Sequence, residues 1–490
     1  MMDLTFATCS EVGRAVRDRK VSAVEVTRHF LKRIGELDPK IGAFTTVNSR
    51  AEAQAADVDA RLARGEAVGP LAGVPIAIKD LLCTKGLRTT ASSKILANFI
   101  PPYSATVVRR LEEAGAICIG KTSLDEFGMG SSNENSAFGS VKNPWNPEYV
   151  PGGSSGGSAA SVAARMALAS IGTDTGGSIR QPSSFCGLFG IKPTYGRVSR
   201  YGIIAFASSL DQAGPMALST EDAALILEVI SGRCERDSTS ADVSVPQFSQ
   251  QISDQVKGLR IGLPKQYFAE KMDADVERVT RESIEALKKR GAILVDVELP
   301  LVKYAVPVYY LVATSEASSN LARYDGMRFG HRSKNATKGD LDDLYSSSRG
   351  EGFGPEVKRR IMLGTYALSS GYYDAYYQKA SQVRRLIRDE FTRAFTQCDV
   401  ILSPVCTSPA FKIGERINDP LAMYLNDIFT TSTNLAGLPG MSVPAGFSKE
   451  GLPIGVQLMA PHFEESRLFN VSSVLEKDLG AAKSRRPHVI

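Results

Sequence analysis

The chain has 490 residues, of which 43% are hydrophobic and 23% are charged, a composition typical of ordinary globular proteins. Its net charge of +5 is small for this length, and its short basic groups, 288–290, 358–360 and 485–486, are too small to form a polyanion-binding stripe. These properties give no support to direct nucleic-acid binding by this chain.

Cysteine usage indicates a reducing compartment. The seven cysteines are scattered, are odd in number and include no CxxC pair, and no cysteine and histidine cluster has zinc-site spacing. The first residues lack the basic and apolar regions of an export signal. No window of about 18 continuous apolar residues is present. We therefore expect a cytoplasmic soluble protein that binds no metal itself and does not span a membrane.

Hydrophobic patterning predicts helices at the start of the chain and alternating strands and helices after about residue 71. Ser22 and Glu25 form a capping box that begins the first helix, and Gly65 closes a second helix over 51–64. The alternation predicts an α/β fold in which helices cover the faces of a sheet. Predicted strands span 74–78, 116–119, 168–171, 259–263, 293–297, 400–402, 441–443 and 455–458. Further predicted helices span 105–114, 158–167, 275–290 and two parts of 355–396 that are separated near Gly371.

Two irregular segments stand out from this alternation. The segment 428–448 has no charged residue, and its prolines and glycines exclude a membrane helix, so we expect a buried loop and strand that lie under the active site. The segment 236–246 is rich in serine, aspartate and threonine and is predicted to be an exposed connection. Neither segment divides the chain into two domains.

Three segments carry residues suited to nucleophilic catalysis. Lys79 ends an apolar run, Ser154 lies in Pro-Gly-Gly-Ser-Ser-Gly-Gly-Ser over 151–158, and Ser178 ends Asp-Thr-Gly-Gly-Ser over 174–178. All four histidines of the chain lie outside these segments. A serine nucleophile here would need another base, and a lysine kept neutral by burial is the known alternative to histidine.

The glycine-rich and serine-rich loop around Ser154 has other interpretations. The spacing of Gly152 and Gly157 fits the start of a phosphate-binding GxxxxGK motif, but Ser158 stands where the lysine is needed. The composition also suits a flexible linker. Against both, an apolar run closely precedes the second loop at 174–178, and small residues leave backbone N–H groups free to approach a ligand. This arrangement favours a catalytic role.

These segments resemble the amidase signature family. The stretch 150–182 carries the family pattern. The runs 192–202 (Lys-Pro-Thr-Tyr-Gly-Arg-Val-Ser-Arg-Tyr-Gly) and 208–212 (Ser-Ser-Leu-Asp-Gln) resemble the glutaminase members that serve tRNA-dependent amidotransferases. The resemblance covers nearly the whole chain, and it implies an amidase signature fold with a large mixed β-sheet covered by helices on both faces. We expect a single domain over 1–490 that comprises an N-terminal helical region (about 1–65), a signature core (about 66–220) and a glutamine-pocket and peripheral region (about 221–490).

The family's hallmark, a Ser-cisSer-Lys triad, implies a role for each of the three residues. Ser178 would be the nucleophile, Ser154, preceded by a cis peptide bond, would relay the proton, and Lys79 would be the base. Because Lys79 must be neutral to accept the proton, we expect its pKa to be lowered. The expected oxyanion hole is formed by the backbone N–H groups of Thr175, Gly176, Gly177 and Ser178.

The resemblance also implies that free glutamine is the acyl donor. Its carboxylate needs a cation, which Arg360 matches, and its ammonium needs an anion, which Asp427 matches. Tyr309, in the pair Tyr309-Tyr310, corresponds to a further contact. The backbone of Met129, Gly130 and Ser131 is expected to line the pocket. On pattern alone, a helix-surface charge at Arg360 and a helix cap at Asp427 are the favoured interpretations.

Three polar neighbours of the triad have less specific roles. Asp80 suits a solvated or capping role at least as well as a catalytic one. Ser155 is expected to support the proton relay by hydrogen bonding, as similar positions do in the family. Arg180 is expected to be structural and to hold the loop that carries Ser178.

The resemblance finally implies partners. Ammonia from glutamine would convert Glu-tRNA(Gln) to Gln-tRNA(Gln) in a heterotrimer with the B and C subunits of the amidotransferase. The larger of these partners would use ATP and Mg²⁺ to activate the glutamyl-tRNA as a phosphate, since this chain has no recognisable nucleotide or metal site. Whether Asp-tRNA(Asn) is a second acceptor is left open by the sequence.

The sequence leaves two alternative functions. One is a stand-alone amidase acting on small amides, which would need neither Arg360 nor Asp427. The other is a non-catalytic assembly protein, which would be expected to have lost part of the triad.

Overall fold

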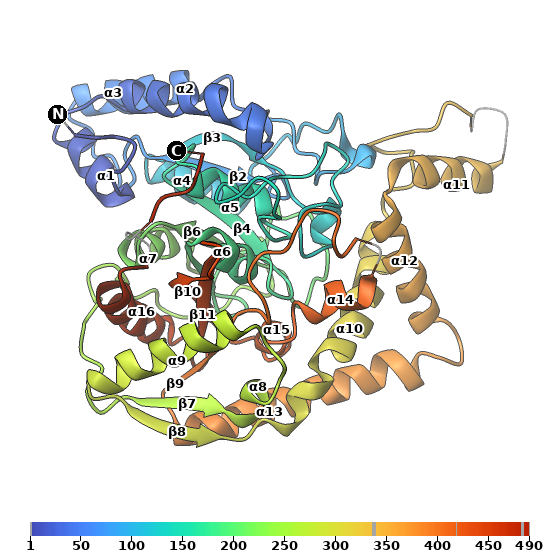
Figure 1. Ribbon diagram of the computed structural model, residues 1–490. Coiled ribbons are helices and arrows are strands. Elements are labelled where there is room, and N and C mark those ends of the chain that lie inside the picture. Colours follow the sequence, from blue (N-terminus) through green and yellow to red (C-terminus); the bar gives the residue numbers. More distant parts are fainter. Residues whose placement is uncertain (1, 336–339, 418, 482–484, 490) are drawn as a thin grey trace.

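An eleven-stranded mixed sheet forms the centre of the fold, which the computed structural model describes for residues 2–335, 340–417, 419–481 and 485–489 (Figure 1). The strands lie in the order β1-β3-β2-β4-β6-β5-β10-β11-β9-β7-β8 within these residues. The pairs β2–β3, β2–β4, β7–β8 and β7–β9 are parallel, whereas the other neighbours are antiparallel. The strands are β1 (Phe44–Val47), β2 (Pro75–Lys79), β3 (Ile117–Thr122), β4 (Ala169–Asp174), β5 (Phe189–Lys192), β6 (Gln212–Ala217), β7 (Arg260–Pro264), β8 (Ile293–Val297), β9 (Val400–Pro404), β10 (Gly440–Phe447) and β11 (Pro453–Met459).

Helices cover both faces of this sheet, as strand β6 shows. Met216 belongs to a hydrophobic cluster with residues of α5 and α6, whereas its neighbour Ala217 belongs to the larger cluster that contains α7, α9 and α16. Because successive side chains of a strand point to opposite faces, the two groups of helices lie on opposite sides. The predicted α/β fold with a large mixed sheet is confirmed. The helices are α1 (Cys9–Arg17), α2 (Ala23–Ile41), α3 (Ala51–Ala63), α4 (Thr106–Glu113), α5 (Gly156–Ala163), α6 (Arg180–Cys186), α7 (Thr220–Ile230), α8 (Lys265–Phe268), α9 (Ala274–Lys289), α10 (Ala305–Leu321), α11 (Leu341–Gly352), α12 (Pro355–Leu368), α13 (Lys379–Gln397), α14 (Pro420–Leu425), α15 (Thr431–Leu435) and α16 (Glu465–Leu479).

The predicted helix ends follow local backbone chemistry. The Ser22 hydroxyl accepts a hydrogen bond from the N–H of Glu25 at 3.0 Å and caps α2. Gly65, just after α3, and Gly115, just after α4, both have left-handed φ angles, of 77° and 89°, which glycine adopts without steric cost. These three predicted helices are therefore confirmed, and of the predicted capping box the Ser22 half is observed.

Other segments differ from their predictions. The uncharged segment 428–448 contains the short helix α15 as well as the expected loop and the strand β10. Strand β1 was not predicted, because its four residues are too few to show a pattern. Strands β5 and β6 were not predicted either, because β5 has four residues and β6 contains both glycine and proline. Both strands are fully buried between neighbours, so pairing within the sheet outweighs their weak local preference.

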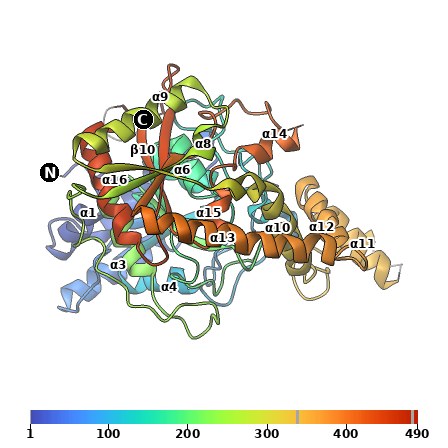
Figure 2. The ribbon, with the colours of Figure 1, turned by 90° about the horizontal axis from the view of Figure 1, so that it is seen from below.

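Helices α11 and α12 project from the side of the molecule, beyond the edge of the sheet, in both views (Figures 1 and 2). Helix α12 packs against α10, and α10 packs against α13 and α15, so this projection is connected to the centre of the fold. Within the described parts of the chain, no helix combines the length and apolar character needed to cross a membrane.

Candidate active site

Lys79, Ser154 and Ser178 are brought to one edge of the sheet. Lys79 is the last residue of β2, and Ser178 follows the end of β4 at Asp174. Strands β2 and β4 are parallel neighbours, so their carboxyl ends meet at the same edge. Ser154 lies just before α5, which contacts both strands.

The Lys79 amine is buried among hydroxyl groups. Its Nζ lies 2.8 Å from the hydroxyls of both Ser154 and Ser155 and 2.9 Å from that of Thr173. Burial lowers the pKa of Lys79 to about 7, although three nearby aspartates act in the opposite direction. A neutral amine has a lone pair that accepts a proton from a hydroxyl, so this contact with Ser154 suits a proton relay. The expected supporting contact of Ser155 is present.

The loops that carry the two serines are tied to each other. The Gly153–Ser154 peptide bond is cis, as the family resemblance implies. The carbonyl of Ser178 accepts a hydrogen bond from the N–H of Ser155 at 3.3 Å. Ser178 is 9% exposed, whereas Ser154 is 1% exposed. Of the two serines, Ser178 is therefore the more accessible to a substrate.

Gln181 joins the Ser154 loop to the predicted substrate loop. Its side-chain oxygen accepts a hydrogen bond from the N–H of Gly153 at 2.9 Å, and its amide nitrogen donates to the carbonyl of Ser131 at 2.7 Å. Sequence reasoning missed this residue, because a single glutamine on a helix carries no pattern. Of the predicted substrate residues Met129, Gly130 and Ser131, Ser131 therefore lies beside the loops that carry Ser154 and Ser178.

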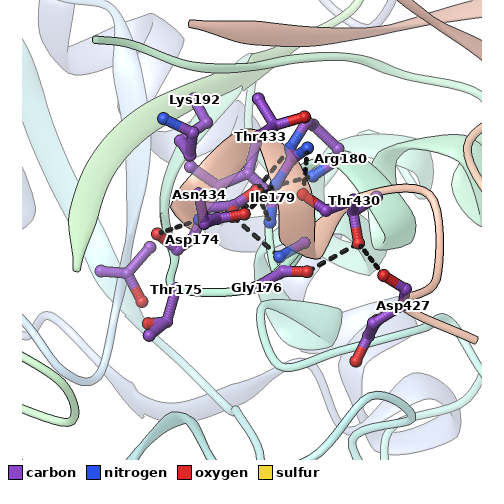
Figure 3. A network of polar contacts seen from close by, with 12 residues as sticks. Asp174, Thr175, Gly176, Ile179, Arg180, Lys192, Asp427, Thr430, Thr433 and Asn434 are labelled. Atoms are coloured by element: carbon purple, nitrogen blue, oxygen red, sulfur yellow. Dashed lines mark hydrogen bonds and ion pairs between the residues drawn. The ribbon is translucent and has the colours of Figure 1, made fainter. Parts of the chain in front are cut away.

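A buried ion pair holds the Gly-Gly-Ser loop (Figure 3). Arg180 donates hydrogen bonds to both carboxylate oxygens of Asp174 at 3.0 Å, and it also donates to the Thr430 carbonyl at 3.1 Å and to the side chain of Asn434. Burial alone would raise the pKa of Asp174, but the charge and hydrogen bonds of Arg180 hold that pKa below its ordinary value. Arg180 therefore has the structural role that the sequence suggested.

Replacing Arg180 by methionine is expected to lower the free energy of unfolding by about 3–5 kcal/mol, because Asp174 would remain buried without its partner. Urea-induced unfolding measures this loss. The control is Arg385→Met, which breaks an exposed ion pair between Arg385 and Asp389 on α13 and should cost less than about 1 kcal/mol. Equal losses in the two variants would contradict a special role for the buried pair.

The backbone of the Gly-Gly-Ser loop offers hydrogen-bond donors next to Ser178. The N–H of Gly177 donates to Asp174 at 2.8 Å, so it is engaged in holding the loop. The N–H groups of Thr175, Gly176 and Ser178 remain the candidate oxyanion donors. The loop also has little space for side chains, because a Cβ on Gly176 would lie 2.6 Å from Cζ of Tyr309.

Asp427 lies beside this loop, between α14 and α15. Its carboxylate accepts a hydrogen bond from the Ser131 hydroxyl at 2.6 Å, and a Cβ on Gly177 would lie 3.4 Å from its Oδ1. Burial raises the pKa of Asp427 to about 7, although the Ser131 hydrogen bond and the Arg360 charge act in the opposite direction. The side chain bonds to Ser131 and caps no helix in the described residues, so the helix-cap alternative is wrong.

Thr430 connects Asp427 to the loop. Its hydroxyl donates to the Gly176 carbonyl at 2.6 Å and lies 3.1 Å from the Asp427 carbonyl (Figure 3). Thr430 and Asn434 lie in the segment 428–448, which is expected to underlie the active site, but the sequence did not reveal their individual contacts with the loop. The only available signal was the abundance of uncharged polar residues in the buried segment 428–448.

Arg360 and the pair Tyr309-Tyr310 are the remaining residues predicted to bind glutamine. Arg360, on α12, is 3% exposed, so the helix-surface alternative is wrong. The ring of Tyr309 touches Gly176, whereas the Tyr310 ring centroid lies 5.2 Å from Cζ of Arg360. The structure thus places Tyr309 at the Gly-Gly-Ser loop and Tyr310 at the guanidinium. Glu356, which accepts a hydrogen bond from Nε of Arg360 at 2.8 Å, was also missed by sequence reasoning.

Asp80 is a correction to the sequence-based expectation. It is fully buried, accepts hydrogen bonds from the backbone and hydroxyl of Thr90, and lies 3.6 Å from the buried amine of Lys121. It is therefore neither solvated nor part of the triad's hydrogen bonds. No group of three or more histidine, cysteine, aspartate or glutamate side chains in the described residues is arranged to hold a metal ion.

Comparisons with known proteins agree with this geometry. The chain matches the Amidase family over residues 25–469. It is 62% identical to the A subunit of the glutamyl-tRNA(Gln) amidotransferase of Bdellovibrio bacteriovorus, over 100% of both chains. Among solved structures, it is similar to the equivalent amidotransferase chain of Thermotoga maritima, with a TM-score of 0.83 and 41% identity over 100% of this chain and 99% of that one. It is also similar to a peptide amidase from Stenotrophomonas maltophilia, with a TM-score of 0.83 and 30% identity over 99% of each chain. The chain therefore belongs to the amidase family.

Proposed function

We propose that this chain is the glutaminase component of a glutamyl-tRNA(Gln) amidotransferase. The observation that carries the proposal is the position of the buried carboxylate of Asp427 next to the Gly-Gly-Ser178 loop. An anion there suits the ammonium group of an amino acid whose side-chain amide reaches Ser178. The names and full-length similarity of the relatives support the same activity.

In the proposed mechanism, the Ser178 hydroxyl attacks the side-chain carboxamide carbon of glutamine. Its proton passes to the Ser154 hydroxyl, and Ser154 gives its own proton to the neutral amine of Lys79. The negative charge on the carboxamide oxygen is stabilised by backbone N–H groups of the loop, each typically worth about 10²–10³ in rate. The proton returns through the same relay to the leaving nitrogen, and ammonia departs. Water then attacks the glutamyl ester, releases glutamate and restores Ser178.

The remaining parts of the reaction belong to partners. The ammonia would convert Glu-tRNA(Gln) to Gln-tRNA(Gln) in a cytoplasmic heterotrimer with the B and C subunits. The partner that binds the glutamyl-tRNA would use ATP and Mg²⁺ to activate it, and this chain would contribute no cofactor. We further propose that residues 1–490 act as one amidase signature domain. The choice between Glu-tRNA(Gln) alone and Asp-tRNA(Asn) as a further acceptor depends on the partners.

Asp427→Ala tests the function, because it separates glutamine binding from the later steps. We expect glutamine-dependent amidation of tRNA by the assembled complex to fall by about 100-fold, since a buried charge partner of the substrate is lost. Amidation driven by added ammonia should change little, because ammonia bypasses the glutamine site. The control, Asp389→Ala, removes an exposed carboxylate and should affect neither reaction.

Equal losses with glutamine and with ammonia would mean that Asp427 is structural and would remove the main support for a glutamine site. A wild-type chain that hydrolyses simple amides but not glutamine would favour the stand-alone amidase alternative.

A further inference from the structure

We propose that Glu356 is a positioning residue that aims the guanidinium of Arg360 at the α-carboxylate of glutamine. This inference rests on the proposed function, and it adds a residue that helps the site to select glutamine as its substrate. Glu356 and Arg360 lie four residues apart on α12, where side chains at this spacing share one helix face.

The carboxylate of Glu356 is held in place by its hydrogen bonds and an ion pair. Its Oε1 accepts one hydrogen bond from Nε of Arg360 at 2.8 Å and a second from the Tyr424 hydroxyl at 3.1 Å. Its Oε2 pairs with Arg359. Glu356 is 8% exposed, so this carboxylate is held from three sides in a buried position.

Only one of the five N–H donors of Arg360 is used by this bond. Among the described residues, its two Nη nitrogens form no hydrogen bond, although the side chain as a whole is 3% exposed. These nitrogens are not among the fully buried polar atoms that lack a partner, so they keep some contact with open space and their N–H groups are free to meet a ligand acceptor. A carboxylate matches the paired N–H groups at that end of a guanidinium.

The bond to Glu356 sets the direction in which those nitrogens point. A guanidinium is planar, so a fixed Nε–H also fixes the opposite, Nη-bearing end. Aromatic rings limit its remaining freedom, because the ring centroids of Tyr310 and Tyr424 lie 5.2 and 5.6 Å from Cζ. These two rings are themselves stacked, with centroids 3.9 Å apart.

A continuous series of contacts links Arg360 to the catalytic loop. The Tyr310 ring meets the Tyr309 ring edge-on at 5.0 Å, and Tyr309 touches Gly176. Arg360 therefore lies one tyrosine pair away from the oxyanion loop. Asp427 lies beside the same Gly-Gly-Ser loop. The guanidinium of Arg360 and the carboxylate of Asp427 can therefore bind the carboxylate and the ammonium of one amino acid.

The test compares glutamine with 4-aminobutanamide, which is glutamine without its α-carboxylate. Ammonia release is measured with the assembled complex carrying Glu356→Gln. We expect kcat/KM for glutamine to fall by about 10-fold to 100-fold, mainly through KM, because a charged hydrogen-bond partner of Arg360 is lost. With 4-aminobutanamide, kcat/KM should change by less than about twofold, since no carboxylate is present for Arg360 to bind.

Two further variants sharpen this result. Tyr424→Phe removes one hydrogen bond from Glu356. Its kcat/KM for glutamine should fall less than that of Glu356→Gln, and its kcat/KM for 4-aminobutanamide should again change little. The control, Glu277→Gln, changes an exposed Glu–Arg pair at the same helical spacing on α9 and should leave both substrates unaffected.

Equal losses of Glu356→Gln on the two substrates would overturn the positioning role and show that Glu356 is merely structural. A selective loss that persists undiminished in an Arg360→Ala background would overturn it as well, because Glu356 would then act without Arg360. Failure of the wild-type complex to hydrolyse glutamine would instead overturn the proposed function, and this inference with it.

Discussion

Lys79→Arg is expected to abolish glutamine hydrolysis, with a loss in kcat of about 10⁴-fold or more, as for other members of catalytic triads. Arginine matches the protonated form of lysine in charge and is slightly longer, but it does not lose its proton in proteins. The hydroxyls of Ser154 and Ser155 would therefore face a permanent cation in place of a base. Steady-state ammonia release by the assembled complex measures this effect.

The same role predicts a pH dependence for kcat. Burial lowers the pKa of Lys79 to about 7, so the amine is neutral above that pH and protonated below it. We expect kcat to fall as the pH drops through about 7, because acid removes the proton acceptor. Asp427 titrates in the same range, but the ammonium of bound glutamine favours its charged form, so this residue should affect KM more than kcat at saturating substrate.

The matched control for this fall in kcat at acid pH is His29→Ala. His29 lies on α2, and its ring lies 3.0 Å from the Thr5 hydroxyl, away from the site. Both the activity and its fall at acid pH should persist in that variant. An active Lys79→Arg enzyme would contradict the assignment, since it would show that position 79 provides charge and not a proton acceptor.

Ser178→Ala is expected to have the second large effect, again with a loss of about 10⁴-fold or more in glutaminase kcat, because no other group takes over as nucleophile. Amidation of tRNA driven by added ammonia should remain within about threefold of the wild-type rate, since the glutaminase step is bypassed and the small substitution leaves the Asp174–Arg180 pair intact. Loss of both reactions would indicate a damaged fold or assembly, and retained glutaminase activity would show that Ser178 is not the nucleophile.

Much of the fold could be predicted because its signals are local. The caps of α2 and α3 and the apolar runs of β2, β3 and β4 are carried by neighbouring residues. Strand β6 shows the limit of this approach. Its glycine and proline oppose a strand locally, and pairing with β4 and β5 overcomes that preference only in the assembled sheet.

The candidate site shows the same division between local and distant information. Lys79, Ser154 and Ser178 lie in compact motifs, so the sequence identified them together. Glu356 lies four residues from Arg360 on one helix, but a glutamate and an arginine at this spacing are common on exposed helices and mark no site. Thr430 had no motif, because it acts through a residue that only folding brings near. Thr430 bonds to Gly176, 254 positions away along the chain, and such a contact has no periodicity or spacing to reveal it.

The identity of the nucleophile is the central claim, and it can be measured directly. The assembled complex is mixed with glutamine, quenched rapidly in acid during turnover, digested and analysed by peptide mass mapping. The proposed mechanism predicts a glutamyl group esterified to Ser178, which disappears in Ser178→Ala and accumulates no further after the glutamine is consumed. A glutamyl adduct on Ser154, or on one of the cysteines, would contradict the account.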